Sequence, residues 1–331
     1  MAIIDSKGYI RGVVGPSVFR RAWGKNIIQS KPRKFKQTAA SIESSSEFGL
    51  ISSTAACLRH AFAPVIRYYD GRAVGRATSA VSASIRGSSG TLRCRRDLHD
   101  GDLSHLVGLE FNRNSPLQDV LRLRAEVARD ESGRVQVQLP ALDMKRDLRL
   151  PERLRTKGYR MQLRFLLIGF NFRENYYEYI GHRELEYRRG KQSAPQTVAL
   201  DGEVPAGCML LLSMSVSLYG SNGFDGEDML LNNLQFSPCA LIGAWQSEEV
   251  IPLTDPNPLP EERIGRFLMA YSGNEILATL AARMKRKAKK SPAPLSQSRE
   301  DPGRRHRPES SREDNLSVLK GKRMNMLPVR K

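Results

Sequence analysis

The stretch YRMQLRFLLIGFNF, Tyr159–Phe172, is the densest apolar run in the chain. In its first half, apolar side chains alternate with Arg160, Gln162 and Arg164, which is the period-two pattern of a half-buried strand. From Phe165 to Phe170 both alternating sets are apolar, as is typical of a strand that is covered on both faces. We therefore expect a β-core that is built around this segment.

Further strands are expected before and after this segment. Upstream, alternation over 121–127 and 135–139 predicts a hairpin that is joined by a glycine-containing loop. Downstream, alternating apolar and aromatic residues predict four more strands, at 176–187, 196–200, 208–219 and 233–245. Because no long helical pattern separates these strands, the predicted fold class is mainly β. We expect an antiparallel β-sandwich with one or two packed helices and flexible basic termini.

Helical periodicity appears in three places. A helix over 38–62, capped by Thr38 or Ser41, is predicted by apolar residues at spacings of three and four. These residues are Phe48, Ile51, Ala55, Leu58 and Phe62. A shorter helix is expected at 77–85. A third, amphipathic helix over 264–290 is predicted to run into the basic sequence RMKRKAKK; its apolar residues are Ile264, Phe267, Leu268, Tyr271, Ile276, Leu277, Leu280 and Met284.

The net charge of +18 is concentrated at the two ends of the chain. Residues 1–36 hold nine Lys and Arg against one Asp, and residues 283–331 hold sixteen against five acidic residues. The middle of the chain, 37–282, has a net charge of only −1. We therefore expect a neutral body with two cationic ends.

These patterns divide the chain into six segments. The last of them has almost no apolar residues until Leu316, so burial there cannot offset an ordering entropy of about 1–2 kcal/mol per residue. The segments are a basic glycine-punctuated arm or hairpin (1–36), a helical and loop segment (37–104), a β-sandwich body (105–250), a proline-rich linker (251–263), an amphipathic basic helix (264–290) and a disordered basic tail (291–331).

The basic ends favour binding to a polyanion, because Lys and Arg side chains that contact phosphates release counterions. We expect a non-enzymatic binding or assembly protein whose partner is nucleic acid or a nucleoprotein assembly. Aromatic residues beside the charges, such as Phe19 and Phe35, are suited to stacking on bases. The candidate nucleic-acid-binding residues are Arg11, Arg20, Arg21, Trp23, Lys25, Lys31, Arg33, Lys34, Lys36, Lys285, Arg286, Lys287, Lys289 and Lys290.

Three other interpretations of the basic ends stay open. The glycine-punctuated arm is suited to adding a strand to the sheet of another copy, which would make the protein a self-associating structural subunit. The amphipathic helix with its basic end is also compatible with an anionic membrane surface. In the third interpretation, the charged ends only keep the protein soluble.

No catalytic motif stands out, and we expect neither an enzyme nor a bound metal or cofactor. His99, Asp100, Asp102 and His105 are capable of binding a metal, but their spacing favours a polar loop. The alternating group His182, Glu184 and Glu186 would place carboxylates on one face of a strand, where acid–base chemistry is possible. The arginines around this group favour a solvated strand face instead.

The remaining global features indicate a cytoplasmic protein. Cys57, Cys94, Cys208 and Cys239 are widely scattered, so we expect reduced thiols and no disulfide framework. We expect no transmembrane segment, because no apolar run approaches the length of a membrane span. The N-terminal sequence also lacks the pattern of a secretory signal.

Several short motifs together resemble an uncharacterised family of bacterial proteins. They are the glycines Gly8, Gly12 and Gly15, the turn Trp23-Gly24-Lys25, the exit Lys31-Pro32-Arg33-Lys34, the helix around Phe48 and the turn Val204-Pro205-Ala206-Gly207 before an apolar strand. The resemblance covers roughly 8–62 and 106–245. It implies an N-terminal arm, a helix and a C-terminal β-body, and it implies no activity, ligand or catalytic residue.

Overall fold

The structure is a computed structural model that describes residues 2–22, 24–32, 37–88, 95–130, 133–155, 160–221, 227–249, 252, 255 and 258–290. Strands predominate over helices, and every pair of named strands is antiparallel. The prediction of a mainly β, antiparallel fold is therefore confirmed.

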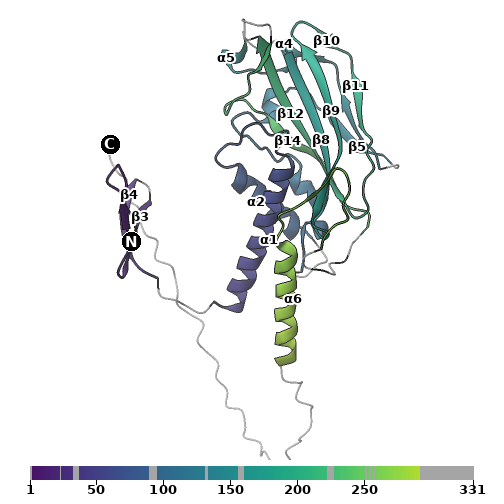
Figure 1. The fold of residues 1–331 in the computed structure, drawn as a ribbon. Helices are drawn as coiled ribbons and strands as arrows, with labels where there is room; N and C mark the ends of the chain where they lie inside the picture. Colours follow the sequence, from purple (N-terminus) through teal and green to yellow (C-terminus); the bar gives the residue numbers. More distant parts are fainter. Residues whose placement is uncertain are drawn as a thin grey trace, which may run out of the picture. The chain divides into compact units, whose positions relative to one another are not determined.

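The central strand is β8 (Arg160–Asn171), which forms where the apolar run predicts it. It lies between β9 (Tyr176–Arg188) and β12 (Met209–Ser221) in a six-stranded sheet (Figure 1). Phe165 of β8 is aligned with Arg183 of β9 and with Met214 of β12. The outer strands are β13 (Asp228–Leu230), β14 (Cys239–Trp245) and β15 (Arg266–Leu268). β14 is shorter than predicted, because Asn233 and Phe236 close a tight turn before it.

The two faces of β8 belong to two different cores. Met161, Leu163 and Phe165 point into a core that the six-stranded sheet shares with a smaller sheet. Ile168 and Phe170 point into a second core on the opposite face, which helices cover. The prediction that this strand is covered on both faces in its second half is therefore confirmed.

The smaller sheet has three strands, β5 (Glu126–Arg129), β6 (Val135–Leu139) and β11 (Gln196–Leu200), in the order β11-β6-β5. It curls like half of a barrel, so the sandwich itself stays a prediction. The strand predicted from residue 121 begins at Glu126. Before it, α3 (Leu117–Val120) forms a helical turn, and Leu121 pairs instead with Leu148.

The connection between β6 and β8 contains short elements. They are β7 (Leu142–Asp143), α4 (Met144–Asp147) and α5 (Glu152–Arg155). β7 pairs with β10 (Gln192–Ser193), which follows β9.

The helical core contains α1 (Ala39–Ala61), α2 (Ala73–Arg86), η1 (Leu98–Asp100) and η2 (Leu103–Leu106). Thr38 caps α1 as predicted, because its hydroxyl accepts a hydrogen bond from the Ser41 amide. Phe48 was wrongly placed on the buried stripe, since its side chain is 63% exposed. Glu47 takes the inward position instead, where its carboxylate pairs with arginines from α2 and the segment before η1.

The helix predicted over 264–290 is wrong in its first third. α6 runs from Gly273 to Lys290, and residues 266–268 form β15 on the edge of the six-stranded sheet. The left-handed backbone at Gly265 breaks a helix there, and the Arg266 guanidinium pairs with Glu178 across the strands. Within the described residues, no helix is long and apolar enough to cross a bilayer. The tail predicted over 291–331 lies outside the described residues.

A separate four-stranded sheet occupies the N-terminal segment. Its strands, β1 (Ala2–Ile4), β2 (Ile10–Val14), β3 (Ser17–Ala22) and β4 (Lys25–Ser30), pair in chain order. Two-residue turns join β2 to β3 and β3 to β4, and Gly15 and Gly24 supply the positive φ that such turns require. None of the strand residues is buried.

Candidate anion-binding site

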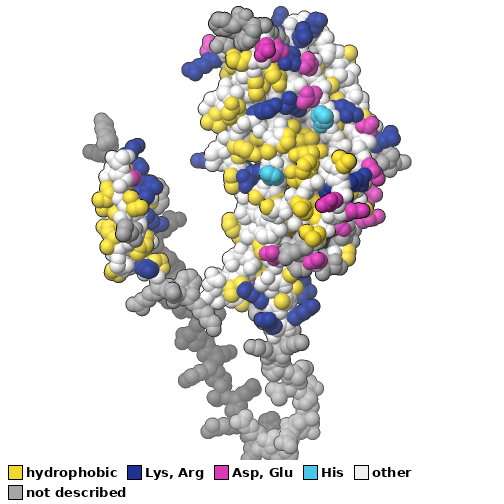
Figure 2. Space-filling view, in the orientation of Figure 1, with side chains coloured by type: hydrophobic (Ala, Val, Ile, Leu, Met, Phe, Trp, Pro, Cys, Tyr) yellow, Lys and Arg dark blue, Asp and Glu magenta, His cyan; other side chains and the backbone are white. Residues whose placement is uncertain are grey.

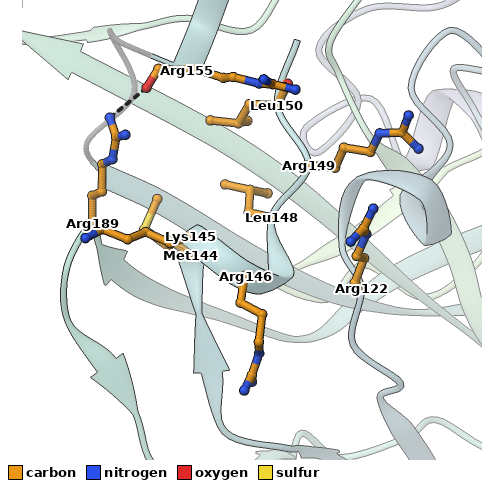
Figure 3. A pocket seen from close by; sticks show the side chains of 9 residues that line it. All are labelled: Arg122, Met144, Lys145, Arg146, Leu148, Arg149, Leu150, Arg155 and Arg189. Atoms are coloured by element: carbon orange, nitrogen blue, oxygen red, sulfur yellow. Dashed lines mark hydrogen bonds between the residues drawn. The ribbon is translucent and has the colours of Figure 1, made fainter. Parts of the chain in front are cut away.

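A pocket of about 330 Å³ lies on the connection between β6 and β8, and basic side chains surround it (Figure 3). Its apolar part consists of Met144, Leu148 and Leu150, and the two leucines lie at the centre of the view. Among the described residues, no acidic side chain lines it. The basic lining residues are Arg122, Lys145, Arg146, Arg149, Arg155 and Arg189.

A short backbone ladder determines which side chains reach the pocket. The Arg122 amide donates to the Asp147 carbonyl, and the Arg149 amide donates to the Val120 carbonyl, both at 2.7 Å. Leu121 and Leu148, which this ladder aligns, are buried in the core between the two sheets. Because side chains alternate along extended backbone, Arg122 and Arg149 are directed outward beside each other.

The turn at α4 is held by carboxylates that do not line the pocket. Asp143 accepts a hydrogen bond from the Lys145 amide at 2.8 Å and thereby caps the turn. Asp147 pairs with Arg146 at 2.7 Å, and this guanidinium holds the pKa of the Asp147 carboxyl below its usual range. Arg146 also points away from the leucines in Figure 3, so it contributes less than the other cations to the pocket.

The remaining basic side chains keep their charge available. Arg155 donates to the Leu150 carbonyl at 3.2 Å, and Arg189 donates to the Arg155 carbonyl at 2.6 Å. Both bonds orient a guanidinium without neutralising it. Within the described chain, no carboxylate lies within ion-pair distance of Arg122, Lys145 or Arg149. The arrangement is therefore suited to an anion with several negative groups, for which Arg is the preferred partner.

A second hollow of about 430 Å³ adjoins the pocket and shares Arg149, Leu150 and Arg155 with it. Its other side contains Asp119 and Glu152, together with Asn114, Gln235 and Phe236. The positive surface is therefore bounded on this side by carboxylates.

None of the residues that line this pocket is among the nucleic-acid-binding residues predicted from the sequence. The segment MKRDLRLPERLR, residues 144–155, contains five Lys or Arg in twelve positions, and this density is the signal that could have indicated it. Its charged, proline-containing composition is equally typical of a connection between strands. The contributions of Arg122 and Arg189 carry no local signal, because only the fold brings them to the same place.

The predicted N-terminal residues divide between the two faces of the small sheet. The register places Arg11, Arg20 and Lys25 on one face. Arg21 lies on the other face, with its guanidinium 3.9 Å above the Tyr9 ring. Lys31 follows β4 and is exposed. Trp23, Arg33, Lys34 and Lys36 lie outside the described residues.

The predicted C-terminal residues belong to the end of α6. Lys285 and Arg286 are exposed, and Figure 2 shows basic side chains grouped over the lower part of this helix. Lys287, Lys289 and Lys290 continue the helix backbone, and their side chains lie outside the described part. The N-terminal strands and α6 thus each present basic residues of their own.

The group around His99 supports local structure. His99 accepts a hydrogen bond from the Phe172 amide at 3.0 Å, and burial lowers the pKa of its imidazole to about 4. Asp100 pairs with Arg173 at 3.0 Å, and Asp102 caps η2. The Asp102 carboxylate also lies 3.9 Å from the His105 imidazole, whereas His99 and Asp100 are engaged by Phe172 and Arg173.

The carboxylates beside His182 are neutralised by the neighbouring strand. Glu184 pairs with Arg164 at 2.8 Å, and Glu186 pairs with Arg160. Arg160 also contacts Asp228 of β13 at 2.6 Å. The group therefore forms a network of ion pairs between β9, β8 and β13, and its carboxylates are engaged as partners of arginine.

The comparisons with known proteins do not add a function to this geometry. No family model matches the chain, and neither a curated protein nor a solved structure is similar to it.

Proposed function

We propose that this protein is a non-enzymatic, cytoplasmic nucleic-acid-binding protein whose body is a β-sandwich that carries the basic pocket. The observation that supports this most directly is the lining of the pocket, in which the described residues include six basic side chains and no acidic one. Phosphate groups along one nucleic-acid strand would contact the guanidinium groups at the rim of the pocket. Such contacts supply most of the affinity in sequence-independent binding.

The apolar part of the pocket favours nucleic acid over a simple anion. Met144, Leu148 and Leu150 offer a surface on which a sugar or an unstacked base can rest between the cations. A cavity of about 330 Å³ lies within the range of small-molecule sites, roughly 300–1,000 Å³. We infer that the pocket holds one nucleotide unit, while neighbouring phosphates contact Arg122 and Arg149 on its rim.

The two basic ends of the protein chain would extend this contact along the nucleic acid. Arg11, Arg20 and Lys25 share one face of the N-terminal sheet, and α6 ends in a basic segment. Contacts of this kind position a polyanion without reading its sequence. The pocket would act as the fixed part of the interface, and the ends would add phosphate contacts.

A salt series with the full chain tests the proposal. Labelled generic DNA and RNA are titrated with wild type, with the double variant Arg122→Gln/Arg149→Gln and with Arg153→Gln. Arg153 belongs to the same segment and is exposed, but it does not line the pocket, so it is the matched control. We expect the double variant to lower the salt slope by about one per lost phosphate contact, and the control to retain the wild-type slope.

Two results would contradict the proposal. One is the absence of DNA and RNA binding by the wild-type chain at low salt. The other is equal binding by the pocket variant and the Arg153 control, which would move the interface away from the pocket. Binding of anionic lipid vesicles without binding of nucleic acid would favour a membrane surface as the partner instead.

A further inference from the structure

Among the described residues, no strand pairs with the outer edge of β4 in the N-terminal sheet. β4 follows β3 through a two-residue turn, so Ala22 and Lys25 face each other as a hydrogen-bonded pair. Antiparallel ladders alternate, and the next hydrogen-bonded pair is Arg20 with Ile27. The hydrogen bond from the Lys31 amide to the Pro16 carbonyl, at 2.6 Å, follows the same alternation. Lys25, Ile27 and Lys31 thus direct their backbone groups toward β3. The alternate residues Asn26, Ile28 and Ser30 therefore direct their amide and carbonyl groups away from β3.

Four outer strands of the body, β5, β13, β14 and β15, are short, covered or charged, whereas residues 26–30 of β4 are not. β13 and β15 have three residues each, and the outer side of β14 is bonded by backbone groups of residues 108–111. β5 carries Glu126 and Arg129 on a strand of four residues. Short, covered or charged edges are the usual defences against pairing. Residues 26–30, NIIQS, contain neither a charge nor a proline, and β4 pairs with β3 without a bulge.

The same sheet leaves its apolar side chains exposed. The register places Ile4, Val14, Phe19 and Ile28 on the face opposite Arg11 and Arg20. Ile4 is 68% and Ile28 is 64% exposed, and Figure 2 shows apolar side chains spread over the visible side of this sheet. A small sheet with no buried residue gains from any partner that extends it.

We propose that β4 pairs with β4 of a second copy of this chain, antiparallel across a two-fold axis at Ile28. In this register Ile28 faces Ile28 of the second copy, and Asn26 faces Ser30 of the second copy. All the outward backbone groups of the three residues are then paired, in about six hydrogen bonds. The two copies of Ile28 adjoin on the face opposite Arg20, where each neighbours its own Phe19. A second copy is the favoured occupant because residues 26–30 are uncharged and their outward donors and acceptors match one another across a two-fold axis.

The charges at the ends of this pairing give it a distinctive salt dependence. The register places Lys25 opposite Lys31 of the second copy, and like charges in this position oppose pairing. Added salt screens the repulsion, so self-association is expected to strengthen as salt rises. Nucleic-acid binding is expected to weaken under the same change. The two interactions are therefore distinguishable in one salt series, and the pairing of β4 does not depend on the proposed function.

Site-directed disulfide formation tests the register. The full chain with Ile28→Cys is oxidised and compared with Gln29→Cys and with wild type, without nucleic acid. Paired copies of position 28 would have Cα atoms about 5.5 Å apart, which suits a disulfide. Position 29 would face Ile27 of the second copy, so its two copies would be more than about 7 Å apart. We expect a cross-linked dimer for Ile28→Cys and only the wild-type background for Gln29→Cys.

The mass in solution tests the association without a cross-link. Light scattering is expected to give twice the chain mass of 37.2 kDa for wild type and for Ile28→Thr, which keeps the backbone donor. Ile28→Pro removes only an outward amide, so it is expected to leave β3–β4 intact and to weaken association about tenfold or more. A wild type of 37.2 kDa at every concentration, or equal cross-linking of the two cysteine variants, would overturn the proposal.

Discussion

The six-stranded sheet of the body and the four-stranded sheet at the N-terminus are both antiparallel, but only the first one is buried. Nearly every residue of β8 and β12 lies in a core, whereas no strand residue of the N-terminal sheet is buried. Backbone pairing is thus common to both sheets, and apolar burial separates them. Because a hydrogen bond contributes only about 1 kcal/mol net, burial is expected to decide which sheet carries the stability.

The same difference applies to their basic residues. In the body, buried Leu121 and Leu148 fix the backbone from which Arg122 and Arg149 project. On the N-terminal sheet, Arg11 and Arg20 project from strands without a core beneath them. Binding through the pocket therefore requires less ordering of the protein, and ordering costs free energy. The pocket is therefore the better candidate for binding an anion in a defined geometry. The N-terminal sheet is the better candidate for nonspecific electrostatic attraction of an anion.

The largest effect is expected from a cavity in the body. Phe170 is fully buried, and its ring lies 5.8 Å from Phe172 and 6.1 Å from Phe62. We expect Phe170→Ala to lower the free energy of unfolding by about 3–5 kcal/mol, because the helices cannot close the space. Urea denaturation followed by circular dichroism measures this loss, with Phe170→Leu as the milder control. A loss below about 1 kcal/mol would show that this core does not carry the stability.

A large effect is also expected from the ion pair that attaches η1 to the end of β8. Arg173 contacts Asp97 and Asp100 at 3.0 Å each, and the Asp97 side chain is 2% exposed. Arg173→Met leaves Asp97 buried without a cation, which typically costs about 3–5 kcal/mol.

The matched control for this variant is Arg183→Met, whose partner Asp201 is half-exposed, as is Arg183 itself. An exposed ion pair of this kind contributes only about 0–1 kcal/mol. Equal losses in urea denaturation of the two variants would contradict the view that burial decides the value of these charges.

A moderate effect, dependent on pH, is expected at Glu110. Burial raises the pKa of its carboxyl to about 7 from an ordinary value of 4.5. The folded state therefore favours the protonated form, and this contribution to stability is present below pH 4.5 and lost as the pH rises through 7. Glu110→Gln stays neutral and keeps an acceptor for the Leu117 amide. Between pH 4.5 and pH 7 and above, we expect the free energy of unfolding of the variant to fall less than that of wild type in urea denaturation. An unchanged pH dependence in the variant would exclude Glu110 as the source of this loss.

The strands of the body could be predicted because their signal is local. β8, β9, β11 and β12 begin and end within about two residues of their predicted limits, since alternation and apolar density are properties of each segment alone. The start of α6 could not be found in this way. The spacing of Ile264, Phe267 and Leu268 fits a helix, but Arg266 pairs with Glu178, which lies 88 residues away. A contact between distant segments leaves no periodic signal in either of them.

The candidate site was predictable only in part, for the same reason. The sequence located basic residues at both ends, and the register then divided Arg20 and Arg21 between opposite faces of one sheet. The pocket in the body combines residue 122, residues 144–155 and residue 189, which only the pairing of the strands brings together. Charge density could be read from the sequence, but the convergence of these charges depends on the tertiary structure.

The smallest effect is expected from an exposed residue of the N-terminal sheet. Ile3 is 71% exposed and lies on the short edge strand β1, so Ile3→Ser removes little burial. We expect the free energy of unfolding of the body to change by less than about 0.5 kcal/mol. Leu163→Ser, the same exchange of an aliphatic side chain for serine on the buried strand β8, is the matched control and should cost several-fold more in urea denaturation. If Ile3→Ser destabilised the body as much as Leu163→Ser, the N-terminal sheet would have to share its cooperative unfolding, and burial would no longer separate the two sheets.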